Sequence, residues 1–427
     1  MQQTAKTREV YGVNRDLPLN YVERKKVDDI FVNNLSRDKH VVIYGSSKQG
    51  KTSLRKHCLN DDDFIVISCL NTMTLADLHG AILKAAGYRI EQTSTKTIGG
   101  RTNYTAEFKG KGKVPLVLEA EGKASVSGED ASEDKKVYAR LELDLHDVND
   151  VITALEEIKF SDYVILEDFH YLPTDTQKNF AFALKAFHEN AKICFIVIGV
   201  WREKNRLIYY NGDLSDRVVS IDVDEWSADE LRQVISAGEA LLNVQFDEQF
   251  SAAVINHAFD SVHLVQEACV RVCDLEGVSE TLKQHRMVGV GSDAPALIKS
   301  IVNEQAGRYS AFIANFSEGF QTTGLEMYKW VLYSVVSSAT QTLAKGLRRN
   351  EIATAIKKKH PQGTGLNEGN ITQALQNIAS LQVQKNVRPI ILDYDQTTRV
   401  LNVVDRSFLI WLAYQDHHEI LQEMGID

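Results

Sequence analysis

A stretch near the amino terminus combines glycines, a lysine and hydroxyl side chains at the spacing of a phosphate-binding loop. It reads Gly45-Ser46-Ser47-Lys48-Gln49-Gly50-Lys51-Thr52 and matches G-x-x-x-x-G-K-[ST]. An apolar run, His40 to Tyr44, precedes it, and a helix-compatible stretch, Ser53 to Cys58, follows it. Glycines let the backbone turn so that successive N–H groups point at phosphate oxygens. The pattern predicts a strand–loop–helix that binds the phosphates of a nucleotide.

The side chains of this loop have separable tasks. Lys51 is expected to reach the β- and γ-phosphates, and the Thr52 hydroxyl to take one position on Mg²⁺. The start of the helix adds partial positive charge at the same place. The alternative is a plain glycine turn between strand and helix. The expected nucleotide-binding residues of the loop are Gly45, Ser46, Ser47, Lys48, Gln49, Gly50, Lys51, Thr52 and Ser53.

A pair of carboxylates follows a later apolar run. Tyr163 to Leu166 reads as a buried strand and ends in Glu167-Asp168. A carboxylate at such a strand end holds the water shell of Mg²⁺, and a second one orients the attacking water. We assign Glu167 to the metal and Asp168 to the water, and a reversal of the two roles stays open. The alternative is a solvated acidic pair.

Further polar residues stand at strand ends or in helical segments. Arg217 precedes the strand Val218 to Val223 and is predicted to act as an arginine finger on a neighbouring subunit. The alternative is a surface arginine paired with Asp213 or Asp216. Arg202 is the nearest candidate for sensing the γ-phosphate after the strand Lys192 to Val200. His170 and His263 are interpreted as packed or solvated histidines.

Composition describes an ordinary soluble chain of two or three domains. The 427 residues carry a net charge of −10, with 44% hydrophobic and 25% charged residues. Five cysteines without a C-x-x-C pair indicate a reducing cytoplasm. The amino terminus lacks the apolar stretch of a signal peptide. The longest apolar run, Ile193 to Trp201, is too short to span a bilayer, so no membrane is expected.

Apolar strands alternate with helices through residues 20–223, after a polar arm at 1–19 that we expect to be extended. The alternation predicts an α/β core with a parallel sheet and helices on both faces. Residues 88–146 interrupt it with three alternating segments, Tyr104 to Phe108, Pro115 to Glu121 and Val137 to Leu143. They predict a projecting β-hairpin or small sheet, and the alternative is a tolerated surface insertion.

The remainder is mostly helical. Residues 224–290 are expected to form a helical lid that opens with the capping box Ser227 and Glu230, and 291–324 a helical connector. Residues 325–427 read as helices at 326–342, 348–359 and 367–382, then strands at 389–394 and 399–404. This order predicts a winged helix-turn-helix domain.

That last domain concentrates positive charge. The stretch from Lys345 to Arg388 holds eight basic and two acidic residues, in a protein that is acidic overall. Together with polar residues of the expected recognition helix, this favours DNA binding. The alternative is a protein-docking or intramolecular latch domain. The basic residues are Lys345, Arg348, Arg349, Lys357, Lys358, Lys359, Lys385 and Arg388.

Taken together, these parts resemble the AAA+ superfamily, in particular its branch of STAND and origin-recognition-type ATPases. The resemblance rests on Tyr21-Val22-Glu23-Arg24, Gly45 to Thr52, Ile165 to Asp168, Arg217 and the order of lid and winged helix. It implies that Tyr21 and Val22 lie near the adenine. The chain departs from the family in its reversed Glu-Asp order, the missing polar sensor and a lid without Gly-x-Pro-Arg. These departures favour slow, switch-like turnover.

The sequence therefore predicts an ATP-binding and hydrolysing switch that forms homo-oligomers and engages DNA or a partner protein. Any effector is expected on a separate chain. Two alternatives stay open. One is a DNA-binding regulator whose nucleotide is structural, and the other is a nucleotide-gated scaffold that polymerises through residues 88–146.

Overall fold

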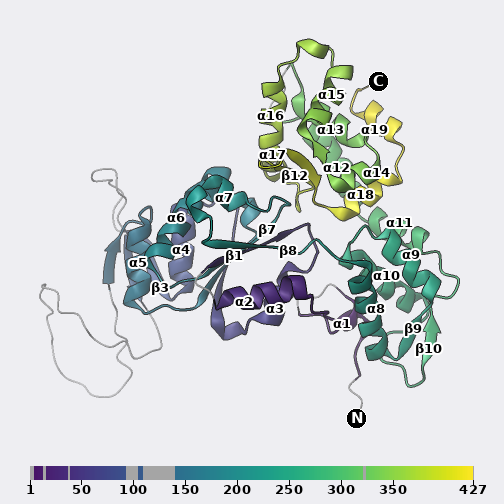
Figure 1. Ribbon diagram of the computed structural model, residues 1–427, viewed down its shortest axis with the longest axis horizontal. Helices are drawn as coiled ribbons and strands as arrows, with labels where there is room; N and C mark the ends of the chain where they lie inside the picture. The colour runs from purple at the N-terminus through teal and green to yellow at the C-terminus, as the bar shows by residue number, and fades with distance from the viewer. Residues whose placement is uncertain are drawn as a thin grey trace, which may run out of the picture.

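The computed structural model describes residues 4–12, 16–36, 39–92, 104–108, 140–320 and 324–426. Within them, a parallel sheet forms the centre of the first half of the chain (Figure 1). All its pairings are parallel, in the order β2-β6-β7-β1-β8. The α/β class is thereby confirmed. The strands are β1 (His40–Gly45), β2 (Phe64–Ser68), β6 (Tyr163–Glu167), β7 (Phe195–Val200) and β8 (Val218–Asp222).

Helices cover both faces of this sheet, as the buried runs require. Val42 and Tyr44 of β1 pack with α4 (Leu75–Ala85), α5 (Val148–Glu157) and α6 (Thr174–Asn190). The intervening Val41 and Ile43 face the other way, toward α2 (Ile30–Leu35) and α3 (Lys51–Cys58). Successive strand residues point to opposite faces, so a continuous apolar run is stable when both faces are covered.

Strand register brings several chain segments to one edge of the sheet. Gly45 at the end of β1 lies opposite Val200 of β7, and Tyr44 lies opposite Asp222 of β8. Glu167 ends β6 opposite Ser68 of β2. Because the strands are parallel, the segments that follow them meet at this carboxyl edge.

The interrupting segment forms a separate antiparallel sheet. Its strands β3 (Tyr88–Gln92), β4 (Tyr104–Phe108) and β5 (Arg140–Leu143) pair in the order β3-β4-β5. The strands β4 and β5 fall in two of the segments expected to form a hairpin or small sheet, whereas β3 was not among them. The segment Pro115 to Glu121 lies outside the described residues.

A helical region follows the parallel sheet. It contains α8 (Ala228–Leu242), α9 (Glu248–His257), α10 (Val262–Leu275), α11 (Ala294–Asn303) and α12 (Ala306–Ser317), with the short strands β9 (Val244–Phe246) and β10 (Arg286–Val288). The capping box is present, since the Ser227 side chain accepts from the Glu230 N–H and the Glu230 carboxylate accepts from the Ser227 N–H.

The amino-terminal segment differs from the extended arm that we expected. Thr7–Val10 form the short helix α1, which lies on the helical region. Tyr11 is completely buried, and its hydroxyl donates to the carbonyl oxygen of Ile235 at 2.5 Å. The apolar side chains of Val10 and Tyr11 account for the difference, because their burial holds an otherwise polar segment in place.

The carboxyl-terminal segment contains more helices than predicted. The expected helix 326–342 is split into α13 (Met327–Val336) and α14 (Thr340–Lys345), and 367–382 is split at Asn377 into α16 (Glu368–Gln376) and α17 (Ile378–Gln384). An antiparallel sheet joins β11 (Leu347–Arg348), β13 (Val400–Val403) and β12 (Leu392–Asp395). The remaining helices are α15 (Arg349–Lys359), α18 (Arg406–Ala413) and α19 (His417–Glu423).

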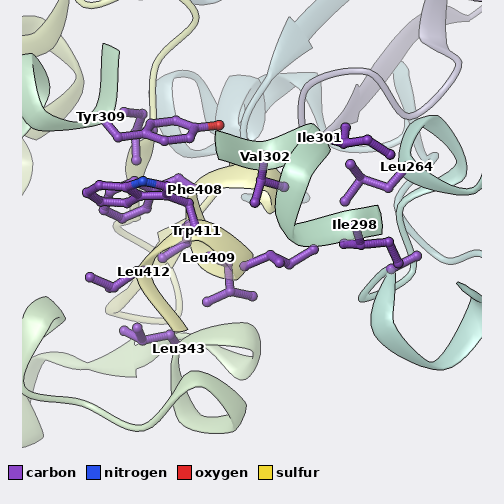
Figure 2. Close-up of a cluster of buried hydrophobic side chains, with 14 of the residues drawn as sticks. Leu264, Ile298, Ile301, Val302, Tyr309, Leu343, Phe408, Leu409, Trp411 and Leu412 are labelled. Atoms are coloured by element: carbon purple, nitrogen blue, oxygen red, sulfur yellow. The ribbon is translucent and has the colours of Figure 1, made fainter. Parts of the chain in front are cut away.

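One apolar core joins this segment to the helical region. Figure 2 shows Phe408 and Trp411 of α18 beside Tyr309 of α12. The ring centroids of Tyr309 and Trp411 are 5.2 Å apart. The same cluster continues through Ile298 of α11 to Leu264 of α10. No helix in the described residues is both long and apolar enough to cross a membrane.

Candidate functional site

The phosphate loop lies at the carboxyl edge of the sheet, between β1 and α3. Gly45 has φ +148°, and a Cβ there would lie 2.8 Å from Cγ2 of Val223. Gly50 has φ +90° and is the N-cap of α3. Side chains disfavour this positive-φ backbone, so both positions require glycine. The spacing seen in the sequence therefore corresponds to a folded loop that leads into a helix N-terminus.

Lys51 is held inside the loop. Its Nζ donates to the carbonyl oxygens of Gly45 at 3.0 Å and Ser46 at 2.6 Å. Burial lowers the pKa of Lys51 to about 8, although Asp224 and Asp168 act in the opposite direction. The ammonium group is thus pre-positioned and poorly solvated, so an ion pair with a negatively charged phosphate is favourable.

The two acidic residues after β6 have different surroundings. Asp168 adopts a left-handed backbone, with φ +58°. Burial raises the pKa of its carboxyl, while the positive charges of Lys51 and Arg388 lower it. Glu167 instead places Oε1 3.1 Å from Nε of Arg55. The Arg55 charge compensates Glu167, so the geometry favours Asp168 as the carboxylate that faces the phosphate loop.

These residues suit a magnesium ion that is bound together with phosphate. Thr52 is exposed at the start of α3, and the Glu167 carboxylate at the end of β6 has Arg55 as its ion-pair partner. Hydroxyl and carboxylate oxygens are ligands that Mg²⁺ accepts, and the ion usually keeps several waters and completes its shell with substrate phosphate. Thr52 and either member of the acidic pair fit that requirement.

Two adjoining cavities open beside the loop. The larger, of about 360 Å³, is lined by Lys48 through Ser53 and by Asp16. The smaller, of about 40 Å³, is lined by Tyr21, Val22 and Trp226. Pro18, Gly50, Ser53, Val262 and Gln266 line both. The structure therefore places Tyr21 and Val22 next to the phosphate loop, where the resemblance expected the base.

The lid contacts the loop through polar bonds. Gln49 Nε2 donates to the Asp260 carbonyl oxygen at 2.9 Å, and Gln49 Oε1 accepts from the Val262 N–H at 3.3 Å. Lys48 Nζ lies 3.1 Å from Nε2 of His263. Burial lowers the pKa of His263 to about 3, so the neutral ring accepts this bond. From the sequence, His263 is interpreted as a packed or solvated residue, whereas the structure shows that it connects the lid to the loop.

Sequence reasoning missed Asp224. This buried carboxylate accepts from the Ser46 N–H at 2.5 Å and from the Ser46 hydroxyl at 2.7 Å. Nε of Arg202 lies 3.5 Å from its Oδ2. The sequence did contain a signal, because Asp222 and Asp224 stand at the end of the strand that neighbours β1. Arg202 therefore reaches the loop through Asp224.

Arg217 lies at the opposite edge of the sheet. Its carbonyl oxygen accepts from the N–H of His40, the first residue of β1. Its guanidinium contacts Glu189 at 3.0 Å and donates to the carbonyl oxygen of Asp213. The expected alternative partners were the carboxylates of Asp213 and Asp216, and the acidic partner found is Glu189. From this edge Arg217 does not join the site of its own chain.

The carboxyl-terminal segment covers part of the phosphate loop. An intramolecular latch was one alternative for this segment, but the sequence did not indicate a contact with the loop. The N–H of Ser47 donates to the carbonyl oxygen of Val404 at 3.0 Å. Val404 follows β13 and is completely buried with Val200, Val383 and Ile390. A backbone carbonyl thus accepts a hydrogen bond from one of the N–H groups that the motif provides for phosphate. Such a contact between distant segments leaves no local pattern in a sequence.

Further bonds hold the same segment to the sheet core. Arg206, after β7, is buried and donates to Asp393 of β12 at 2.6 Å. The hydroxyls of Thr174 and Ser380 are 3.2 Å apart, which joins α6 to α17. Arg388 lies over the ring of Tyr171, 4.9 Å from its centroid. The contacts come from α17, the segment between α17 and β12, β12 itself and the loop before α18, and together they form a docked interface (Figure 1).

The basic stretch of this segment is partly neutralised. Glu368 pairs with both Arg349, at 3.0 Å, and Lys357, at 2.6 Å. Lys385 pairs with Glu318 at 3.0 Å. The positive charge available to a nucleic acid is therefore smaller than the sequence count of eight basic residues indicated.

No family model matches this sequence, and no curated protein matches it. Solved structures do resemble it. A Walker-type ATPase of Pyrococcus abyssi is 14% identical with a TM-score of 0.51, covering 92% of this chain and 99% of that chain. The ORC1 protein of Aeropyrum pernix in complex with DNA is 11% identical, with a TM-score of 0.42 and coverage of 100% and 98%. A RuvB variant of Thermotoga maritima is 12% identical, with a TM-score of 0.37 and coverage of 90% and 92%.

At these identities the likeness concerns the fold. The first comparison shows that the chain has the fold of a Walker-type ATPase over nearly its whole length. This agrees with the P-loop α/β fold expected from the sequence.

Proposed function

We propose that the chain is a slow ATP-binding and hydrolysing switch, in which the nucleotide controls the docking of the carboxyl-terminal domain. Through that domain it controls self-association and the binding of DNA or a partner protein. The observation that carries this proposal is the bond from the Ser47 N–H to the Val404 carbonyl. The Ser47 N–H belongs to a loop suited to bind phosphate, and a distant domain accepts a hydrogen bond from this same donor.

The chemistry follows from the residues around the loop. The N–H groups of the loop and the Lys51 ammonium bind the phosphates of ATP and offset the charge that develops on them. Magnesium, when bound, neutralises phosphate charge and is expected on Thr52 and an acidic neighbour. Asp168, which faces Lys51, orients the attacking water, and Glu167 remains the alternative for this role.

Competition for Ser47 supports the coupling. A phosphate that takes the Ser47 N–H must displace Val404, and a charge-assisted bond to phosphate is stronger than a neutral bond to a carbonyl. Val404 leads directly into Asp405, which binds Arg308 of α12 at 2.6 Å. The lid, α12 and α18 share one apolar core. A displacement of Val404 from the loop should therefore move these elements together.

The carboxyl-terminal segment is proposed to be a winged-helix domain. In support, α13, α15 and α16–α17 precede the β12–β13 hairpin, and β11 completes its sheet. In this order α16–α17 is the recognition helix. Both α17 and the turn of the hairpin contact the ATPase core, the turn through a 2.9 Å hydrogen bond from Thr397 to Glu203. The domain would therefore have to leave the core before it binds DNA. Lys345, Arg348 and Lys358 have no ion pair in the described residues and are available to phosphates.

Binding and turnover of ATP test the proposal. Lys51→Ala should weaken ATP binding at least about tenfold, because a charged hydrogen-bonding partner of phosphate is lost. Asp168→Asn should keep ATP binding and slow phosphate release, since the amide is a poor base. Lys192→Ala, which changes a lysine before β7 and away from the loop, serves as the control. Hydrolysis at the wild-type rate by Lys51→Ala would show that the site is misassigned.

A further inference from the structure

Gln266 stands where the two cavities beside the phosphate loop meet. It lies on α10 and lines both the larger cavity, which contains the loop, and the smaller one next to Tyr21 and Val22. In the proposed nucleotide site, a base beside Tyr21 and Val22 also lies beside Gln266. The polar atom that Gln266 presents there therefore matters for the choice of base.

The orientation of the Gln266 amide is fixed by a chain of hydrogen bonds. The carbonyl oxygen of Val234 accepts only, so the group of Asn20 that lies 3.1 Å from it must be the Nδ2 amine. Oδ1 of Asn20 then accepts from Nε2 of Gln266 at 3.3 Å. Asn20 is 1% exposed, so its amide is held in place. Gln266 is left with Oε1, which has no partner in the described part of the chain.

We infer that Gln266 selects adenine over guanine by presenting a fixed hydrogen-bond acceptor to the 6-position of the base. The amino group of adenine donates to such an acceptor. Guanine carries a carbonyl oxygen at the same position, and two acceptors facing one another leave both without a donor. Asn20 acts as a positioning residue, because it prevents the amide from rotating to offer its amine instead. The inference rests on the proposed nucleotide site.

Affinities for ATP, GTP and 2′-deoxy-ATP test this assignment in the full chain. The wild-type protein should bind ATP at least roughly tenfold more tightly than GTP. Gln266→Met keeps the side-chain volume without the amide, and should bring the two affinities within about threefold by weakening ATP. Asn20→Ala frees the Gln266 amide to rotate and offer its amine to guanine, so this variant should also bring the two affinities closer together. Gln233→Met, on the exposed side of α8, is the matched control.

Several results would overturn the assignment. One is an unchanged ATP preference in Gln266→Met, and another is an unchanged ATP preference in Asn20→Ala. A third is a change confined to the ratio of ATP to 2′-deoxy-ATP, which would place the amide at the ribose. Failure of the nucleotide site itself looks different, because no triphosphate would then bind the wild-type protein and Lys51→Ala would change nothing.

Discussion

Lys51 combines two opposing influences at the scale of a single residue. The loop carbonyls of Gly45 and Ser46 hold its ammonium group in position, whereas burial favours the neutral amine. A negatively charged phosphate at the loop would restore the charged form. The side chain therefore binds a proton and a nucleotide cooperatively, and ATP affinity should depend on pH in the range where the free protein loses that proton.

The pH dependence has a definite sign. Since the pKa of Lys51 is lowered to about 8, ATP affinity should be constant below pH 8 and fall by up to about tenfold per pH unit above it. The stability of the free protein should change in the opposite direction. Between pH 8 and the ordinary value of 10.5 the unfolded chain keeps the proton that the folded chain has lost, so unfolding becomes less favourable.

Titration of ATP by calorimetry at constant ionic strength, from pH 7 to 9.5, measures this effect. Lys51→Arg is the control, because its guanidinium remains charged throughout the range. An equal decline of affinity with pH in wild type and Lys51→Arg would assign the titration to another group.

Single residues also show which parts of the site could be predicted from the sequence. Lys51, Thr52 and the acidic pair follow from a local motif, because phosphate binding requires fixed spacing along the chain. Asp224 lies 178 residues from Ser46, and its contribution depends on the pairing of β8 with β1. The Val404 carbonyl is a backbone atom, which any residue supplies, so no side-chain pattern could predict its contact with the loop.

At the scale of elements, α17, the β12–β13 hairpin and the loop that starts α18 dock on the ATPase core together. Among the connecting bonds, the pair of Arg206 and Asp393 is buried, whereas Thr174 and Ser380 touch through hydroxyls near the rim. Removing one partner of a buried ion pair is strongly destabilising. A covalent link at the hydroxyl pair tests docking without disturbing that buried pair.

Thr174→Cys combined with Ser380→Cys should form a disulfide that locks the docked arrangement, since the two hydroxyl oxygens are 3.2 Å apart. Under oxidising conditions ATP affinity should fall roughly tenfold or more, because Val404 keeps the Ser47 donor that phosphate requires. Duplex DNA binding should also be lost. Calorimetry and fluorescence anisotropy measure the two effects.

Reductant provides the internal control, because it should restore both ATP and DNA binding in the same sample. The single variant Thr174→Cys controls for the five native cysteines, of which Cys58 and Cys194 are partly exposed. If the locked protein binds duplex DNA as well as the reduced protein does, the docked face is not the DNA-binding face.

Element boundaries show where local patterns were sufficient. The strands β1, β6, β7 and β8 and the capping box before α8 depend on local apolar runs and caps, and they were predicted. The division of 326–342 into α13 and α14 was missed, because apolar periodicity continues across Ser337 to Ala339 while the backbone turns there. The short helix α1 was missed because its stability comes from packing against α8 and α10.

At the scale of the whole molecule, the sheet separates two functional edges. The phosphate loop lies at the carboxyl edge, and Arg217 precedes β8 at the amino edge. Arg217 therefore cannot reach the phosphate loop of its own chain, and action on a phosphate would require the loop of another copy. A contact between unlike surfaces of identical chains repeats from copy to copy, which produces rings or filaments rather than closed two-fold dimers.

Mixing two variants that each hydrolyse ATP slowly tests this arrangement. Arg217→Ala should bind ATP but hydrolyse it at least roughly tenfold more slowly, because a positive charge is lost from the transition state of a neighbour. Its folding stability should change by no more than about 1 kcal/mol, since the pair with Glu189 is exposed. An equal mixture with Asp168→Asn creates interfaces with both residues intact, about a quarter of the total for random head-to-tail assembly. Phosphate release by the mixture should recover to a comparable fraction of the wild-type rate.

Arg232→Ala is the control, because Arg232 is an arginine of similar exposure that is paired with Glu248. This variant should hydrolyse ATP at the wild-type rate. A protein that stays monomeric with ATP and Mg²⁺ at every concentration, or a mixture that is only the sum of its parts, would exclude action of Arg217 on a neighbour.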